Sequence, residues 1–140
     1  MEEIIKWLGI ISPMALGAIG SAIGCMIAGA GLAGALPRTK ESHGGLIAMS
    51  AAPSSQTIYG LVLMMTLKGA NGSGAQFLAI GLLCGVAIMI SSVMQGRCCA
   101  AGIRATVEDK TVYGKCWIPV GVTESFAVFA MVFGMIALQA

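Results

Sequence analysis

The sequence predicts an all-α membrane protein with four transmembrane helices, arranged as two duplicated hairpins. Hydrophobic residues make up 57% of the 140 residues and charged residues only 10%, too few to cover the surface of a soluble domain. Four apolar stretches each exceed the ~20 residues that a helix needs to cross a bilayer. These predicted spans are roughly residues 7–36, 46–67, 77–103 and 117–138.

The first and third spans are rich in small residues. The segment "GAIGSAIGCMIAGAGLAGA" contains Gly20 and Gly24 four residues apart, and Gly81 and Gly85 repeat that spacing in the third span. Small residues let helix backbones approach closely, so we expect these two helices to form the crowded inner wall of a homo-oligomeric ring. Ordinary packing within a single bundle is the alternative. The acidic start "MEEIIKW" lacks a small-residue cleavage site, which favours a retained span over a signal peptide.

The second and fourth spans are bulkier, and Phe126, Phe129 and Phe133 follow one another along the fourth. We expect both spans to face lipid on the outside of the ring. A chain this small and apolar has little means of building a complete transport path alone, which favours a ring of identical copies.

Short polar connections join the spans, so successive helices must be antiparallel neighbours. Residues 1–67 form the first predicted hairpin, 68–76 a connecting loop and 77–140 the second hairpin. Basic residues concentrate in the first and third loops: Arg38, Lys40, Arg104, Lys110 and Lys115. By the positive-inside rule, loops 37–45 and 104–116 face the cytoplasm, while the 68–76 loop and both termini lie outside. The net charge of +2 is therefore a topology signal and not a nucleic-acid footprint.

The two hairpins resemble diverged copies that differ at one ionisable position. The triplet "SQT" at 55–57 matches "TES" at 123–125, so Gln56 and Glu124 hold equivalent places. Gln95 lies 15 residues before residue 110, near the middle of loop 104–116, and Glu124 lies 14 residues after it. Gln56 lies 16 residues after residue 40, in the first loop. These three side chains should therefore converge at one membrane depth.

Two hydroxyl residues and a proline lie close to Gln56 in the second span. Ser55 and Tyr59 are four residues apart on one helix face, and Pro53 removes an amide donor and loosens nearby carbonyls. One carboxylate among hydroxyl, amide and carbonyl oxygens suits Na⁺, or a proton on the acid, better than a divalent ion. The alternatives are a Glu124 that snorkels to the interface and glutamines that only join helices. The cysteines fit apolar packing better than metal binding.

The segments "PSSQTIYG" (53–60), "MQGRCCAAGI" (94–103) and the stretch around Glu124 resemble the proteolipid rotor-ring family, the c or K subunits of V-type and archaeal-type rotary ATPases. The resemblance covers essentially the whole chain and points to the sodium-binding branch. It implies that Glu124 is the ion-carrying carboxylate on which transport depends. Na⁺ ligands are implied at Gln56, Gln95, the Ser55 hydroxyl and the Ala52 backbone carbonyl, with Tyr59 as a supporting hydrogen-bond donor.

The resemblance also implies a non-catalytic subunit of an ATP-driven, ion-translocating pump, without an organic cofactor, in the cell membrane. Its expected partners are identical copies in a ring, a stator subunit with a membrane arginine, a central-stalk subunit on the cytoplasmic loops, and lipid. A proton-carrying rotor subunit is the first alternative. A small four-helix solute or multidrug carrier is another, although such carriers usually place their acid in the first helix. A purely structural channel-forming protein is the third.

Overall fold

The computed structural model describes residues 1–40 and 43–138, and these are helical along nearly their whole length. Residues 41–42 of the expected 37–45 loop, and residues 139–140 at the end of the expected second hairpin, lie outside the described residues. The elements are α1 (Glu2–Ala35), η1 (Leu36–Arg38), α2 (Gly44–Ala51), η2 (Ala52–Ser54), α3 (Ser55–Gly69), α4 (Gly74–Glu108), η3 (Lys110–Val112) and α5 (Tyr113–Ala137), where η denotes a short 3-10 helix.

Four rods in the described part of the chain are long and apolar enough to cross a membrane. They are Glu2–Arg38, Gly44–Gly69, Gly74–Glu108 and Lys110–Ala137. This confirms the predicted all-α fold with four membrane-competent helices. Each helix continues past its apolar stretch into flanking polar residues, because helical hydrogen bonding does not stop where the hydrophobic run ends. The second rod is composite: α2, η2 and α3 follow one another without a loop.

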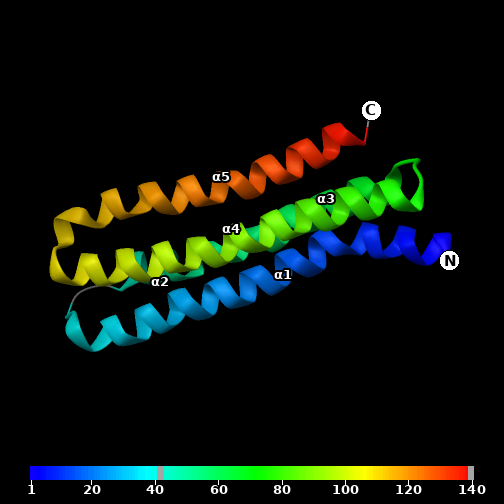
Figure 1. Ribbon diagram of the computed structural model, residues 1–140. Helices are drawn as coiled ribbons and strands as arrows, with labels where there is room; N and C mark the ends of the chain where they lie inside the picture. The colour runs from blue at the N-terminus through cyan, green and yellow to red at the C-terminus, as the bar shows by residue number, and fades with distance from the viewer. Residues whose placement is uncertain (41–42, 139–140) are drawn as a thin grey trace.

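The four rods run nearly parallel or antiparallel, with α1 and α4 in contact, α3 against α1, and α5 against α4 (Figure 1). Both termini and the α3–α4 turn lie at one end of the bundle. The connections that follow α1 and α4 lie at the other end. The two hairpins therefore pack through α1 and α4, the helices with the most small residues.

Glycines let α1 and α4 touch backbone to backbone. A Cβ on Gly81 would collide with the carbonyl oxygen of Gly9, and one on Gly20 would lie 2.7 Å from the Cα of Met89. A Cβ on Gly31 would similarly come within 2.9 Å of the Cα of Ala100. This is the close approach expected from the small-residue pattern.

The core consists of two apolar clusters with a polar layer between them. One cluster, towards the 36–43 connection, contains Ala28, Ala35, Leu46, Met49, Cys99, Ile103 and Val120. The other, towards the termini, contains Ile10, Leu63, Leu67 and Phe77. Between them lie the buried polar side chains Ser21, Gln56, Ser91, Ser92 and Gln95. Because buried polar groups need partners, this layer is where the chemistry of the molecule is concentrated.

The outside of the bundle is apolar. Leu83, Phe126 and Phe133 are 70%, 60% and 63% exposed, respectively. A soluble monomer rarely exposes so much apolar surface. This surface therefore suits lipid or neighbouring protein better than water.

Candidate functional site

The polar layer centres on Glu124, in the middle of α5. Its Oε1 accepts hydrogen bonds from Ser55 Oγ at 2.7 Å and Tyr59 OH at 2.8 Å. Its Oε2 accepts a longer bond from Gln95 Nε2 at 3.4 Å. Ser55 and Tyr59 lie one turn apart on α3, and Gln95 is on α4. Three helices therefore meet at one carboxylate, and all three of these donors are neutral.

Two fully buried glutamines form the floor of this site. Gln56 Nε2 donates to Gln95 Oε1 at 2.8 Å, and Gln95 Nε2 also donates to the carbonyl oxygen of Val120 at 3.1 Å. Both side chains are 0% exposed. Because Gln95 engages the amide nitrogen of Gln56, the oxygen of Gln56 is left to face Ser55.

Ser55 lies where oxygen atoms crowd together. Its Oγ is 2.7 Å from Glu124 Oε1, 3.1 Å from the carbonyl oxygen of Ala52 and 3.3 Å from Gln56 Oε1. A serine hydroxyl carries a single proton and can donate it to only one acceptor at a time. Glu124 Oε1 also accepts from Tyr59 OH, and the carbonyl oxygen of Ala52 also accepts from the backbone amide of Ser55. Four oxygen atoms therefore lie close together with few protons among them.

A break in the second rod brings the Ala52 carbonyl to this corner. Pro53 has no amide hydrogen and cannot continue the α-helical ladder. The chain tightens into the 3-10 turn Ala52–Ser54 before α3 begins at Ser55. The break also turns Ser55 inward, so that backbone and side-chain oxygens from one short segment face the carboxylate.

The atoms that surround Ser55 Oγ are all oxygens, which are hard ligands, and together they carry the single negative charge of Glu124. The described residues contain no group of three or more His, Cys, Asp or Glu side chains that could hold a metal ion. Divalent ions usually require more carboxylates than one. The oxygens of Glu124, Ser55, Gln56 and Ala52 therefore fit a monovalent cation.

Comparison with known proteins agrees with this architecture. A family model that describes the C subunit of ATP synthase matches residues 8–67 and again residues 78–137. The two matches fall on the two hairpins, as expected for an internal duplication. The chain belongs to the ATP synthase C-subunit family.

Within the ATP synthase C-subunit family, a curated relative is the K subunit of the A-type ATP synthase of Methanocaldococcus jannaschii. It is 29% identical to this chain, over an alignment that covers 91% of this chain and 64% of the relative. The chain therefore spans just under two thirds of the length of the curated relative that it matches.

In this member of the C-subunit family, the structure brings together all the site residues expected from the sequence. Ser55, Tyr59 and Gln95 contact Glu124 directly. Gln56 joins the cluster through Gln95 and Ser55. Ala52 joins it through its backbone carbonyl, which Ser55 contacts.

Three serines around this cluster were not expected from the sequence. Ser91 Oγ donates to the carbonyl oxygen of Thr123 at 2.6 Å, and Ser92 Oγ donates to that of Pro53 at 2.8 Å. Ser21 Oγ accepts from the backbone amide of Thr57 at 3.2 Å. The sequence does contain an indication of them, because each serine is a polar residue in the middle of an otherwise apolar span. Serine is also a common small packing residue in membrane helices, so composition alone did not mark them.

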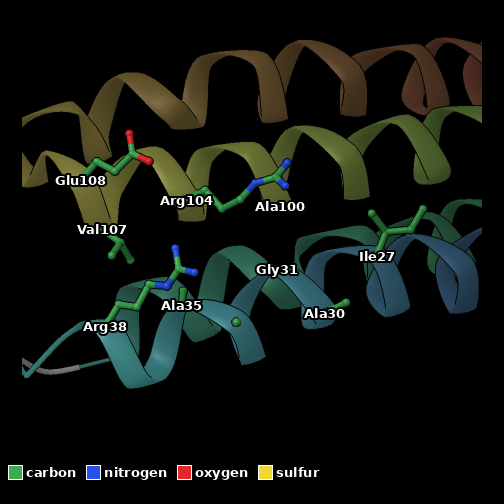
Figure 2. Close-up of a pocket in the computed structure, with 10 residues that line it drawn as sticks. Ile27, Ala30, Gly31, Ala35, Arg38, Ala100, Arg104, Val107 and Glu108 are labelled. Atoms are coloured by element: carbon green, nitrogen blue, oxygen red, sulfur yellow. The ribbon is translucent and has the colours of Figure 1, made fainter.

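A separate cavity of about 440 Å³ lies between the ends of α1 and α4, away from the carboxylate (Figure 2). Arg38 and Arg104 reach into it from opposite helices above small residues such as Gly31, and Glu108 lies at its end. It contains no residue of the Glu124 cluster. The basic residues that line this cavity are therefore separate from the Glu124 cluster.

Proposed function

We propose that this chain is a rotor-ring subunit of an A-type or V-type rotary ATPase, which carries Na⁺ across the membrane on Glu124 as the ring turns. Family membership and the similarity to an archaeal K subunit support the rotor role. Copies of the chain would form the ring, a stator subunit with a membrane arginine would face it, and a central-stalk subunit would bind loops 37–45 and 104–116. ATP would be hydrolysed elsewhere in the complex.

The main support for Na⁺ as the transported ion is the cluster of oxygen atoms around Ser55 Oγ. Three acceptor oxygens lie within 3.3 Å of one hydroxyl that has one proton to give. A cation placed among these atoms would be coordinated by oxygens that already lie close together. The site would then be neutral, with Gln95 and Tyr59 at its border.

The hydrogen bonds of Glu124 are compatible with the same choice. Ser55, Tyr59 and Gln95 can each donate to the carboxylate. These bonds hold both carboxylate oxygens in place, so that they can face a bound cation.

Neutralisation explains how the carboxylate can pass lipid. An isolated acid at the bilayer centre costs about 2.5–3.5 kcal/mol on insertion scales and more in simulations. A bound monovalent cation removes most of this cost. Release opposite a positively charged stator residue would then be favoured, because the bare carboxylate gains a new counter-charge there.

Labelling of Glu124 with a carbodiimide, which reacts with protonated carboxyls, tests this proposal. The reaction is followed in the purified assembly with 0 to 100 mM NaCl, with potassium chloride keeping the ionic strength constant. We expect millimolar sodium to slow labelling at neutral pH and to lose this effect as the pH falls. Equal labelling rates at every sodium concentration would contradict a sodium site and leave the proton-carrying rotor subunit as the alternative. An ATPase that co-purifies with the chain would separate both rotor functions from a solute carrier.

A further inference from the structure

Two serines outside the carboxylate cluster hold the broken segment of the second rod. In an uninterrupted α-helix the carbonyl of Pro53 and the amide of Thr57 would bond to each other, since they are four residues apart. Here Ser92 Oγ of α4 donates to the carbonyl oxygen of Pro53 at 2.8 Å. Ser21 Oγ of α1 accepts from the amide of Thr57 at 3.2 Å. Each serine thus supplies a partner to one end of this backbone pair.

The same segment, residues 52–55, supplies two of the oxygens that lie close to Glu124. The carbonyl of Ala52 immediately precedes Pro53, and Ser55 begins α3 two residues after Pro53. Both lie in the oxygen cluster around Glu124. A small rotation of the turn would therefore move two of the atoms that surround the proposed cation, because they belong to the same short stretch of backbone.

The turn is enclosed at Pro53, although Ser54 is exposed, so water has little room to replace the hydroxyl of Ser92 there. Ser92 and Pro53 are both fully buried. A Cβ on Gly24 of α1 would lie 2.8 Å from the Cβ of Pro53 and 2.5 Å from the backbone oxygen of Ser92. If Ser92 lost its hydroxyl, the carbonyl of Pro53 would lose a buried donor.

We propose that Ser92 and Ser21 are positioning residues that set the cation affinity of the site by fixing the Ala52–Ser54 turn. This inference rests on the proposed sodium function. In the structure both hydroxyls bond to backbone atoms of residues 53–57, and Ser21 also lies 3.5 Å from the carbonyl oxygen of Ser54. They act on the ion through the direction of the backbone and are not themselves donors to the carboxylate.

The inference predicts different effects on sodium and on protons. Coordination by several oxygens depends on where the turn places Ala52 and Ser55. Protonation of Glu124 in the absence of sodium depends less on the turn, because Tyr59 and Gln95, which also donate to the carboxylate, lie outside it. We therefore expect each substitution to raise the sodium concentration that gives half-protection from carbodiimide by about tenfold. The pH dependence of labelling without sodium should shift by a much smaller factor.

Thr106→Val is the matched control. Thr106 is also a buried hydroxyl residue of α4, and its Oγ1 bonds to the carbonyl oxygen of Gly102 within the same helix, far from the turn. We expect it to keep wild-type sodium protection. The three variants and the wild-type assembly are compared in the same labelling titration, with thermal stability measured alongside. If Ser92→Ala does not assemble, Ser21→Ala carries the test, because Ser21 makes longer and less buried hydrogen bonds.

The outcomes separate this inference from the function on which it rests. If sodium does not protect Glu124 in the wild-type assembly, the sodium function itself is wrong. If the wild type is protected and both serine variants need the same sodium concentration, the positioning role is wrong. It is also wrong if the serine variants shift the sodium and the proton titrations by equal factors, since that pattern indicates a general loss of structure.

Discussion

At the scale of single residues, the polarity of this molecule is concentrated on one acid and its neighbours. Glu124 is half-buried and takes hydrogen bonds from Ser55, Tyr59 and Gln95. Each hydrogen bond to a charged group contributes about 1.5–3 kcal/mol. The cluster therefore holds the carboxylate in one position and keeps its oxygens turned towards Ser55 and Gln95.

Substituting this acid is the most direct residue-scale test. We expect Glu124→Gln to abolish carbodiimide labelling at this position and sodium transport by the complex, because a neutral amide cannot balance a cation. Glu3→Gln removes an exposed carboxylate at the start of α1 and should leave both intact. Undiminished sodium transport in the Glu124→Gln assembly would contradict the proposed role of this residue.

A second residue-scale prediction concerns the turn between α4 and α5. The side-chain hydroxyl and the backbone amide of Thr111 donate to Asp109 Oδ1 at 2.7 and 2.9 Å, and these bonds lower the pKa of Asp109 below its ordinary value of 3.8. Because the folded pKa lies below the unfolded one, this contribution to stability is complete above pH 3.8 and is lost as the pH falls through the folded pKa.

An NMR titration of the Asp109 carboxyl in detergent micelles measures this effect. We expect a midpoint below 3.8 in the wild-type chain. Thr111→Val removes the hydroxyl bond, which is the larger cause, and should move the midpoint upward. An unchanged midpoint in that variant would show that the hydroxyl does not hold the carboxylate.

At the scale of secondary-structure elements, two devices shape the site. Pro53 interrupts the second rod and places Ala52 and Ser55 at the carboxylate. Glycines in α1 and α4 bring those helices into backbone contact, which lets Ser21 and Ser92 reach the interrupted segment from both sides. The position of the oxygen cluster around Glu124 therefore depends on helix packing some distance from Glu124.

Two glycine substitutions test this packing. Gly81→Ala places a Cβ against the backbone of Gly9, which can relieve the clash only if the helices separate. We expect a loss of about 1–3 kcal/mol in the free energy of unfolding, as for other overpacked cores. Gly29→Ala is the control, since a Cβ there meets nothing within 4 Å and should be neutral or stabilising. Thermal unfolding in detergent compares the two, and equal melting temperatures would contradict close α1–α4 packing.

At the scale of the whole molecule, the outer surface of the bundle exposes large apolar side chains. Large apolar side chains such as Leu83, Phe126 and Phe133 face outward. The chain carries one membrane carboxylate for four membrane-competent helices. For a ring with a given number of helices, this means fewer ions per turn than one carboxylate per two helices would give.

Native mass spectrometry of the intact detergent-solubilised assembly tests the ring. We expect one dominant species whose mass is an integer multiple of the chain mass, because a closed rotational assembly has a fixed copy number. Under the proposed function, the number of copies would also give the number of ions carried per turn. A monomer as the dominant species under mild conditions would contradict the ring.

Much of this organisation could be predicted from the sequence. The four helices follow from apolar runs longer than the bilayer requires, and α1–α4 packing follows from closely spaced glycines. The meeting of Gln56, Gln95 and Glu124 could be anticipated by counting residues from the loops, since antiparallel helices rise at equal rates. These features depend on local composition and helical geometry, both of which the linear sequence contains.

The hydrogen-bond partners within the polar layer became clear only from the packed bundle. The sequence indicated that Pro53 weakens its helix. It did not indicate that Ser92 and Ser21, from two other helices, would bond to the carbonyl of Pro53 and the amide of Thr57. Nor did it indicate that one hydroxyl of Ser55 would face three acceptors. Such partnerships depend on the rotation of each helix about its axis and on distances of a few tenths of an ångström. These are set by packing across the whole bundle, whereas helix existence is set by the residues of each segment alone.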